Sequence, residues 1–124
     1  MYSEEILRHF QNPCNVGKIE NADGFGEGHG GTNCPEDLAH CWITVEDDRI
    51  VDVKQLTRGC PVAIASSSAA TELAKGKALQ EAVAIDEKLV AEALGEMPER
   101  KLDSLVGPRA LQCAIADYLR KRAG

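Results

Sequence analysis

Hydrophobic residues follow two different spacings along this chain. The runs CWITV at 41–45 and IVDVKQL at 50–56 are joined by the turn-like EDDR, and their apolar pattern is typical of β-strands, so we expect an antiparallel hairpin. Helical spacing appears before and after the hairpin, with helices expected to begin near Ser3, Pro61, Leu79, Asp86 and Asp103. A helix, a hairpin and then several helices is the order of an α+β fold rather than of alternating α/β units.

The segment from Gly17 to Asn33 has little apolar pattern and contains six glycines. Such a segment is typical of a flexible loop that carries function, or of an ordered and turn-rich stretch, with short pieces of edge strand around Phe25. We therefore expect an α+β fold in which a small antiparallel sheet of about three strands packs against several helices.

Composition narrows the class of protein. A chain of 124 residues can bury one core, so we expect a single domain over residues 1–124. The net charge is -6 and basic residues cluster only at 120–122, which argues against a nucleic-acid partner. No apolar run approaches the roughly 20 residues that cross a bilayer, and the N-terminus is acidic where a signal peptide is basic. We expect a cytoplasmic protein with no membrane contact.

The five cysteines are the most unusual part of the composition: Cys14, Cys34, Cys41, Cys60 and Cys113. An odd number cannot pair completely into disulfides, and the expected cytoplasmic setting disfavours structural disulfides. No two of them have the C-x-x-C spacing of a zinc ribbon or a thioredoxin-like motif. Any metal site would therefore have to be assembled by the fold.

Four residues at expected element boundaries are candidate metal ligands: Cys34, Asp37, Cys60 and Asp103. Cys60 falls at the expected N-terminus of a helix, where the positive end of the helix dipole favours a thiolate; the alternative is a small residue that fills a tight turn. Asp37 is either an oxygen ligand or a turn residue. Asp103 is either a ligand or the N-cap of the last helix.

The remaining cysteines and the histidines have less obvious roles. Cys41 and Cys113 lie within apolar elements, so both are expected to fill the core. Cys14 lies in the turn NPCNVG without an obvious partner and is expected to be an exposed thiol. Among the histidines, His29 in the glycine-rich segment is the one candidate for a further ligand, although a solvated loop residue is the favoured interpretation.

The string GCPVAIASSS at 59–68 is the most specific of several motifs that together span nearly the whole chain. The others are YSEEILRHFQNPCNVG at 2–17, Cys34 and Asp37 before the first long strand, ELAKGK at 72–77 and AIADY at 114–118. In combination these motifs resemble the U-type iron-sulfur cluster assembly scaffolds, the family of IscU and of the N-terminal domain of NifU.

The resemblance implies that three cysteines and one aspartate, on loops at one end of an α+β fold, hold a cluster while it is assembled. Cys34 matches the first cysteine, Cys60 the second and Asp37 the aspartate. One inserted residue makes Glu36 a competitor for the acidic role. The third cysteine is missing, because Asp103 stands where the family has it.

Two further departures from the family pattern surround this position. Leu102 replaces the histidine that precedes the third cysteine, and Cys113 cannot substitute for that cysteine because ten residues of helix span about 15 Å. The stretch MPERK at 97–101 differs from the LPPVK motif of scaffolds that a dedicated chaperone serves. This difference argues against a dedicated chaperone as a partner. The resemblance leaves open whether the protein forms a homodimer.

For function, the resemblance implies a scaffold or carrier without turnover chemistry of its own. It would bind iron or a 2Fe-2S cluster through Cys34, Asp37, Cys60 and Asp103, with a cysteine desulfurase and apo iron-sulfur acceptor proteins as partners. Zn²⁺ could substitute, because two thiolates and two carboxylates suit a tetrahedral zinc site. The alternative is a cluster-incompetent paralogue that binds a metal or the desulfurase. A metallohydrolase or thiol oxidoreductase has less support, since spacing positions no general base or resolving cysteine.

Overall fold

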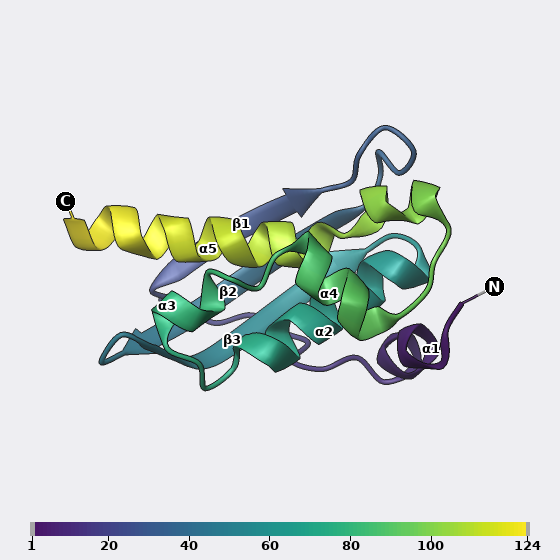
Figure 1. Ribbon diagram of the computed structural model, residues 1–124. Helices are drawn as coiled ribbons and strands as arrows, with labels where there is room; N and C mark the ends of the chain where they lie inside the picture. The colour runs from purple at the N-terminus through teal and green to yellow at the C-terminus, as the bar shows by residue number, and fades with distance from the viewer. Residues whose placement is uncertain (1, 124) are drawn as a thin grey trace.

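The computed structural model describes residues 2–123 and shows an α+β fold, as expected from the order of the sequence patterns (Figure 1). In chain order the elements are α1 Glu4–Gln11, β1 Gly24–His29, β2 Leu38–Glu46, β3 Arg49–Arg58, α2 Pro61–Ala74, α3 Leu79–Ala82, α4 Glu87–Leu94, the 3-10 helix η1 Glu99–Ser104 and α5 Val106–Ala123. The strands form one antiparallel sheet in the order β1-β2-β3. Among residues 2–123, no helix is both long enough and apolar enough to cross a membrane.

Helices cover one face of the sheet, with α5 against β1 and β2, and α2 against β3. Alternate residues of β2, namely Ala39, Cys41 and Ile43, are buried beneath these helices. The opposite face carries Phe25 and Trp42, whose ring centroids lie 5.3 Å apart on neighbouring strands. One buried and one partly exposed face explain the alternating pattern in the sequence.

The glycine-rich segment contains an ordered strand rather than only a loop. In β1 the glycines alternate, and Gly24, Gly26 and Gly28 all lie on the face that meets α5. A Cβ atom on Gly28 would lie 2.1 Å from the Val106 carbonyl oxygen, and one on Gly26 would lie 2.3 Å from the Ala114 amide nitrogen. These glycines are therefore required for the close approach of the α5 backbone to the strand.

Helix α2 runs through the middle of the molecule, in contact with α1, β3, α4 and α5. The spacing of Ile64, Ala65, Ala69 and Leu73 predicts one apolar side for this helix. In the structure, Ile64 and Leu73 are only partly buried, while the serines at 66–68 are fully buried. The helix is surrounded on most sides, so small residues, rather than one apolar stripe, mark its contacts.

The ends of most helices follow the expected signals. Ser3 accepts a hydrogen bond from the Ile6 amide at 3.1 Å, and Asp86 accepts one from the Leu89 amide at 2.9 Å. The start of the last helix was expected near Asp103 but lies at Val106, because residues 99–104 form η1. The interpretation of Asp103 as the N-cap of the last helix is therefore wrong.

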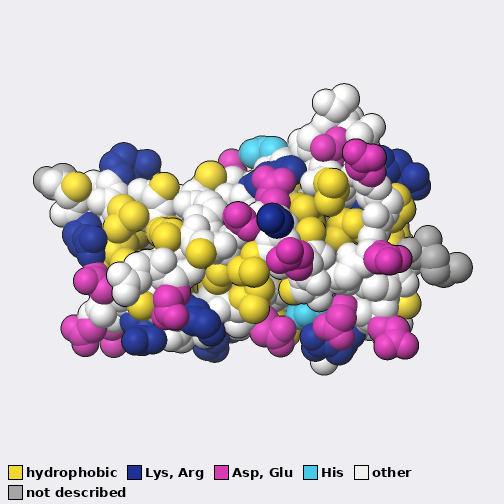
Figure 2. Space-filling model, viewed as in Figure 1, with side chains coloured by type: hydrophobic (Ala, Val, Ile, Leu, Met, Phe, Trp, Pro, Cys, Tyr) yellow, Lys and Arg dark blue, Asp and Glu magenta, His cyan; other side chains and the backbone are white. Residues whose placement is uncertain are grey.

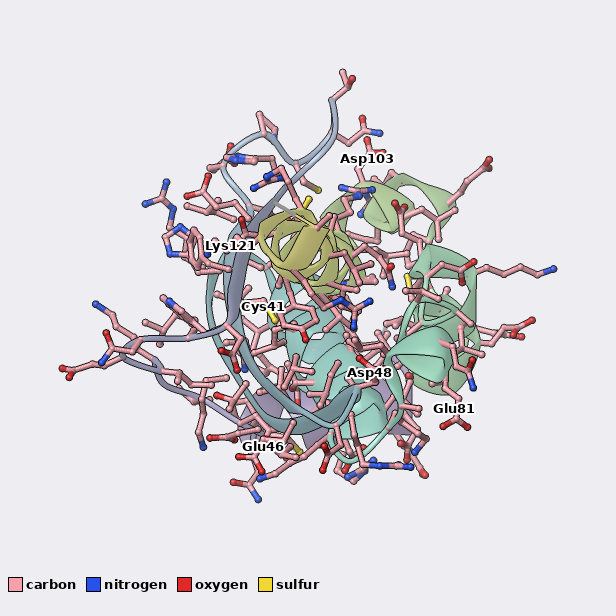
Figure 3. All side chains as sticks on the ribbon, turned by 90° about the vertical axis from the view of Figure 1, so that its left-hand side faces the viewer. Cys41, Glu46, Asp48, Glu81, Asp103 and Lys121 are labelled. Carbon is pink, nitrogen blue, oxygen red and sulfur yellow. The ribbon has the colours of Figure 1, made fainter. Side chains whose placement is uncertain are left out.

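Two cysteines that were both expected in the core have different environments. Cys41 is buried between the sheet and the helices, where burial raises the pKa of its thiol to about 12 (Figure 3). Cys113 is exposed on α5, so the expectation of a core position is wrong for this residue. Its neighbours Ala114 and Ile115 are buried in the core, whereas Cys113 lies beside Gly26 of β1 and remains exposed.

Candidate functional site

Three segments that are distant in the sequence bring two thiols, a carboxyl group and a hydroxyl group together at one end of the fold. The Ser104 hydroxyl lies 2.9 Å from the Cys34 sulfur and 3.2 Å from the Cys60 sulfur. The Cys60 sulfur also lies 3.6 Å from Asp37 Oδ2. We call Cys34, Asp37, Cys60 and Ser104 the thiol site.

The loop between β1 and β2 positions Cys34 and Asp37 through its own backbone hydrogen bonds. The amide of Cys34 donates to the Gly31 carbonyl at 3.0 Å, and the amide of Asp37 donates to the Cys34 carbonyl at 3.1 Å. The loop closes where the Gly30 amide donates to the Asp37 carbonyl at 2.9 Å. This turn buries both side chains, at 7% and 5% exposure, respectively.

The second segment is the turn that leads from β3 into α2. Cys60 is the N-cap residue of α2 and Pro61 occupies the first turn, as expected from the sequence. Gly59 before it has φ +142, and a Cβ atom there would lie 2.3 Å from Asp37 Oδ1. Only glycine combines this backbone conformation with the close approach of the carboxylate.

Of the two acidic residues that competed for the ligand role, only one faces the thiols. Asp37 is buried beside Cys60, whereas Glu36 is exposed. The inserted residue therefore extends the turn on its solvent side and leaves the aspartate in contact with the cysteine sulfur.

Asp103 lies beside the loop that carries Cys34, but its carboxylate has other partners. Its Oδ2 atom accepts hydrogen bonds from the backbone amide and the side-chain amide of Asn33, both at 2.9 Å. Its backbone carbonyl accepts a further bond from the Gly31 amide at 2.9 Å. Asp103 thus fastens η1 to the cysteine-bearing loop, while its neighbour Ser104 contacts the sulfur atoms.

Sequence reasoning missed Ser104 and Arg109. A single serine beside an apolar run gave no signal, because only the 3-10 geometry of η1 turns Ser104, fully buried, toward the thiols. Arg109 donates to the His29 carbonyl at 2.8 Å and to the Asp103 carbonyl at 3.0 Å, and it holds Glu87 with two bonds of 3.0 Å. The paired Glu87 carboxylate raises the pKa of Arg109. This guanidinium joins β1, η1 and α4 behind the site.

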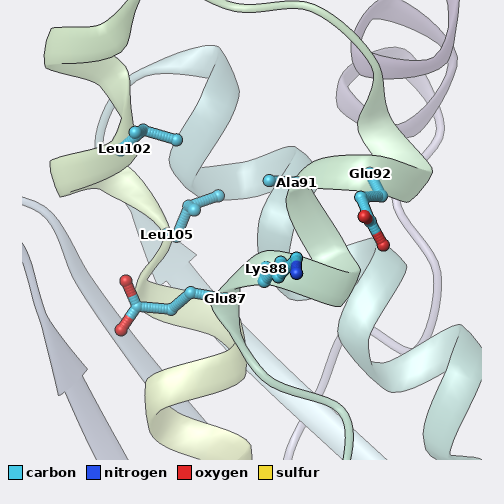
Figure 4. Close-up of a pocket in the computed structure, with 6 residues that line it drawn as sticks. All are labelled: Glu87, Lys88, Ala91, Glu92, Leu102 and Leu105. Carbon is cyan, nitrogen blue, oxygen red and sulfur yellow. The ribbon is translucent and has the colours of Figure 1, made fainter.

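An apolar depression of about 430 Å³ lies between α4 and η1, next to the ion pair of Arg109 and Glu87 (Figure 4). Its lining includes Ala91, Leu102 and Leu105, and no cysteine or histidine. Figure 2 shows hydrophobic side chains at the surface of this face among acidic and basic ones. The depression therefore offers no thiolate or imidazole, the ligands on which an iron-sulfur cluster depends.

Cys14 was expected to have no partner, but in the structure its side chain contacts Glu72. Cys14 is half-buried, with its sulfur 3.7 Å from Glu72 Oε2, and Glu72 in turn lies 3.6 Å from the Nε2 atom of the buried His9. The expected candidate among the histidines, His29, is instead exposed beside Glu27. We call His9, Cys14 and Glu72 the histidine cluster.

Comparison with known proteins identifies the class that this fold and site define. The profile of the NifU-like N terminal domain matches residues 1–124. The chain is 52% identical over 122 residues to the iron-sulfur cluster assembly scaffold protein IscU 1 of Archaeoglobus fulgidus, covering 98% of this chain and 78% of that protein. It is 44% identical over 124 residues to the scaffold protein IscU of Escherichia coli K12, covering 98% and 96%.

Solved structures agree with the sequence comparison. A candidate iron-sulfur cluster assembly scaffold of the SUF system from Fervidobacterium islandicum AW-1 superposes with a TM-score of 0.72 at 26% identity, covering 92% of this chain and 96% of that one. The N-terminal part of a NifU-like protein from Brucella abortus shares the fold, with a TM-score of 0.73 at 16% identity, covering 96% and 94%. The chain belongs to the NifU-like N-terminal domain family, which confirms the resemblance found in its motifs.

Proposed function

We propose that this protein is an iron-sulfur cluster assembly scaffold that holds iron and the growing cluster, its cargo, at the thiol site. The observation that carries the proposal is the convergence of two cysteine sulfurs on one hydroxyl group, with the Asp37 carboxylate beside the Cys60 sulfur. Thiolate sulfur is the usual protein ligand of iron-sulfur clusters, and carboxylate oxygen is a harder, weaker substitute. The family membership and the relatives named as scaffolds support this function.

Each residue of the thiol site has a distinct role in this proposal. Cys34 and Cys60 supply thiolates, releasing their protons to solvent when metal binds, and Asp37 supplies an oxygen ligand beside the Cys60 sulfur. Asp103 supplies the fourth ligand by exchanging Asn33 for iron. Ser104 donates a hydrogen bond to the Cys34 sulfur, which stabilises a thiolate there. Oxygen in place of the third thiolate makes a bound cluster more labile, which suits a transient carrier.

The proposal extends to partners and cellular setting. A cysteine desulfurase provides the sulfur and apo iron-sulfur proteins receive the cluster, so the scaffold needs no turnover chemistry of its own. The cargo is a 2Fe-2S cluster, and Zn²⁺ fits the same mixed donor set. All five cysteines are free, which is consistent with the reducing conditions of the cytoplasm.

Anaerobic reconstitution with ferrous iron and sulfide tests the proposal. The expected product absorbs visible light and contains both iron and acid-labile sulfide. Cys34→Ser and Cys60→Ser should each abolish this absorption, whereas the matched control Cys113→Ser, which alters an exposed cysteine on α5, should leave it unchanged. A colourless product from the unaltered protein would contradict cluster assembly at this site.

One observation favours a second candidate function, a paralogue that binds a desulfurase but builds no cluster. Asp103 stands where the family has its third cysteine, and its carboxylate accepts hydrogen bonds from Asn33. Asp103→Cys separates the two functions. If the altered position alone limits a working scaffold, this variant should hold its cluster longer than the unaltered protein. If it stays colourless while the protein still binds a purified cysteine desulfurase, the paralogue is the correct interpretation.

A further inference from the structure

A histidine, a cysteine and a glutamate from three segments meet beside the C-terminal half of α2. His9 comes from α1, Cys14 from the turn after α1, and Glu72 from α2. One ligand atom of each lies within 4.8 Å of the other two. We propose that this histidine cluster is a second metal site, for a divalent transition ion of the zinc type, that is separate from the thiol site.

The distances from Glu72 to the other two residues are close to those between neighbouring ligands of a tetrahedral ion. Zinc bonds of about 2.0–2.3 Å to nitrogen, oxygen and sulfur place neighbouring ligand atoms about 3.5 Å apart. His9 Nε2 lies 3.6 Å from Glu72 Oε1, and the Cys14 sulfur lies 3.7 Å from Glu72 Oε2. A small movement of the half-exposed Glu72 side chain completes a three-ligand site, with water in the fourth position.

His9 is already oriented as a metal-binding histidine. Its side chain is only 4% exposed, and its Nδ1 atom lies 2.7 Å from the hydroxyl of the fully buried Ser68. The other ring nitrogen, Nε2, lies 3.2 Å from the Arg8 guanidinium, which can only donate. Nε2 is therefore the acceptor and Nδ1 carries the proton, so the lone pair of Nε2 becomes available to a metal ion when Arg8 moves away. A ligating histidine whose second nitrogen donates a hydrogen bond is the common arrangement in metal sites.

Ser68 organises the cysteine as well as the histidine. Its hydroxyl oxygen accepts a hydrogen bond from the backbone amide of Cys14 at 2.8 Å. The turn that carries Cys14 is further held by Gln55, whose side-chain amide donates to the Cys14 carbonyl at 3.0 Å. Two of the three ligands thus share one buried support on α2, which reduces the conformational entropy lost when a metal binds.

Arg8 is the group with which a metal ion must compete. Its guanidinium contacts His9 Nε2, but it also bonds Glu5 at 2.8 Å, and its side chain is 54% exposed. The arginine can therefore swing away from the histidine while it keeps Glu5 as its partner. Its positive charge beside the cluster lowers the affinity for a cation, which makes Arg8 a second test of the site.

The histidine cluster and the thiol site lie toward opposite ends of α2. Cys60 is the N-cap of this helix, and Glu72 comes twelve residues later, which corresponds to about 18 Å along the helix axis. One ion cannot be shared across that distance. Metal bound at one site can therefore be measured in a variant that lacks the ligands of the other site.

The experiment uses the full chain with Cys34→Ser and Cys60→Ser, which removes both thiols of the thiol site. After treatment with a chelator, this protein should bind one Zn²⁺ in equilibrium dialysis. With Co²⁺ it should show a thiolate-to-cobalt charge-transfer band. Adding Cys14→Ser should remove the band, and Glu72→Gln should weaken binding. Loss of an outer partner of a metal ligand costs about 10–100-fold in affinity, so loss of a ligand should cost at least that much.

Three further variants keep the test decisive. Cys113→Ser, in the same background, should change neither affinity nor spectrum, because this thiol is exposed on α5. Arg8→Gln should tighten Zn²⁺ binding severalfold. His9→Asn keeps a polar group near Ser68 and should lose the ion while the protein remains folded by circular dichroism. No binding in the Cys34→Ser, Cys60→Ser background, or a cobalt band that persists in Cys14→Ser, would overturn the proposal.

Discussion

The thiol site and the histidine cluster are both built on α2, but they use the helix differently. At the N-terminus of α2, the sulfurs of Cys34 and Cys60 each contact the Ser104 hydroxyl, and Asp37 contacts Cys60. Near its C-terminal end, His9 and Cys14 both contact Ser68, which lies inside the helix. The first arrangement depends on the shape of two turns and the second on one buried side chain. Different substitutions should therefore disable each of them without disturbing the other.

The largest expected effect is that of Gly59→Ala, directed at the thiol site. The new Cβ atom would lie 2.3 Å from Asp37 Oδ1 at a φ of +142, so the carboxylate must move away from Cys60. We expect iron loading to fall severalfold and stability to drop by about 3 kcal/mol, at the upper end for a strained residue. Iron analysis and urea unfolding measure the two effects.

Gly76→Ala is the matched control for this substitution. Gly76 also has a positive φ, of +85, but a Cβ atom there would have no neighbour within 4 Å. It should lose stability through backbone strain alone and keep full iron loading. Equal iron loss in both variants would show that strain, rather than the displaced carboxylate, governs the thiol site.

The next effect, directed at the histidine cluster, is that of Ser68→Ala. The substitution leaves the buried His9 nitrogen and the Cys14 amide without their common partner. An unsatisfied buried polar group costs about 1–3 kcal/mol, so the free energy of unfolding measured in urea should fall by this amount. Iron loading of the thiol site should stay unchanged. A matched loss of iron would mean that the two ends of α2 are coupled.

Asp103→Ala should have a smaller effect on stability. It removes two hydrogen bonds from Asn33 to a partly exposed carboxylate, together worth about 1 kcal/mol. The loop should become more mobile, with faster amide hydrogen exchange at Asn33 and unchanged exchange at Cys14. Unchanged exchange at both positions would contradict the role of Asp103 in fastening the loop.

The smallest effect is a pH dependence of the metal-free protein. Burial, and then the neighbouring Arg8 charge, lower the pKa of His9, with Glu72 and Glu5 acting in the opposite direction. Because the folded state resists protonation, the stability that neutral His9 contributes is complete above the unfolded pKa of about 6.5 and is lost as pH falls through the folded value. Unfolding by urea with a chelator present should show this slope, and His9→Asn should remove it.

Much of the fold could be predicted because its signals are local. The β2–β3 hairpin, the Asp86 cap and the position of Cys60 before Pro61 depend on neighbours in the sequence, and the structure has all three. The strand β1 was only partly predicted, since its glycines are explained by contact with α5, about eighty residues later. Cys113 was misplaced because an apolar neighbourhood does not say which side of a helix a residue occupies.

The candidate sites show the same division. The motifs of the chain indicated Cys34, Asp37 and Cys60, which the structure brings together, and left Glu36 as a competitor that proves to be exposed. Ser104 could not be found in this way, because its contact with both sulfurs depends on the 3-10 turn of η1. The histidine cluster was missed because its members come from three separate segments and acquire meaning only when α1 packs on α2.

The alternating glycines of β1 have a consequence for the thiol site, although none of them belongs to it. Val106, whose carbonyl lies against Gly28, is only two residues after Ser104. The absence of a side chain at Gly28 therefore determines how closely the first turn of α5 approaches β1. The position of the Ser104 hydroxyl relative to the Cys34 and Cys60 sulfurs follows from that approach. A single methyl group added at Gly28 would lift this end of the helix and open the thiol site from behind.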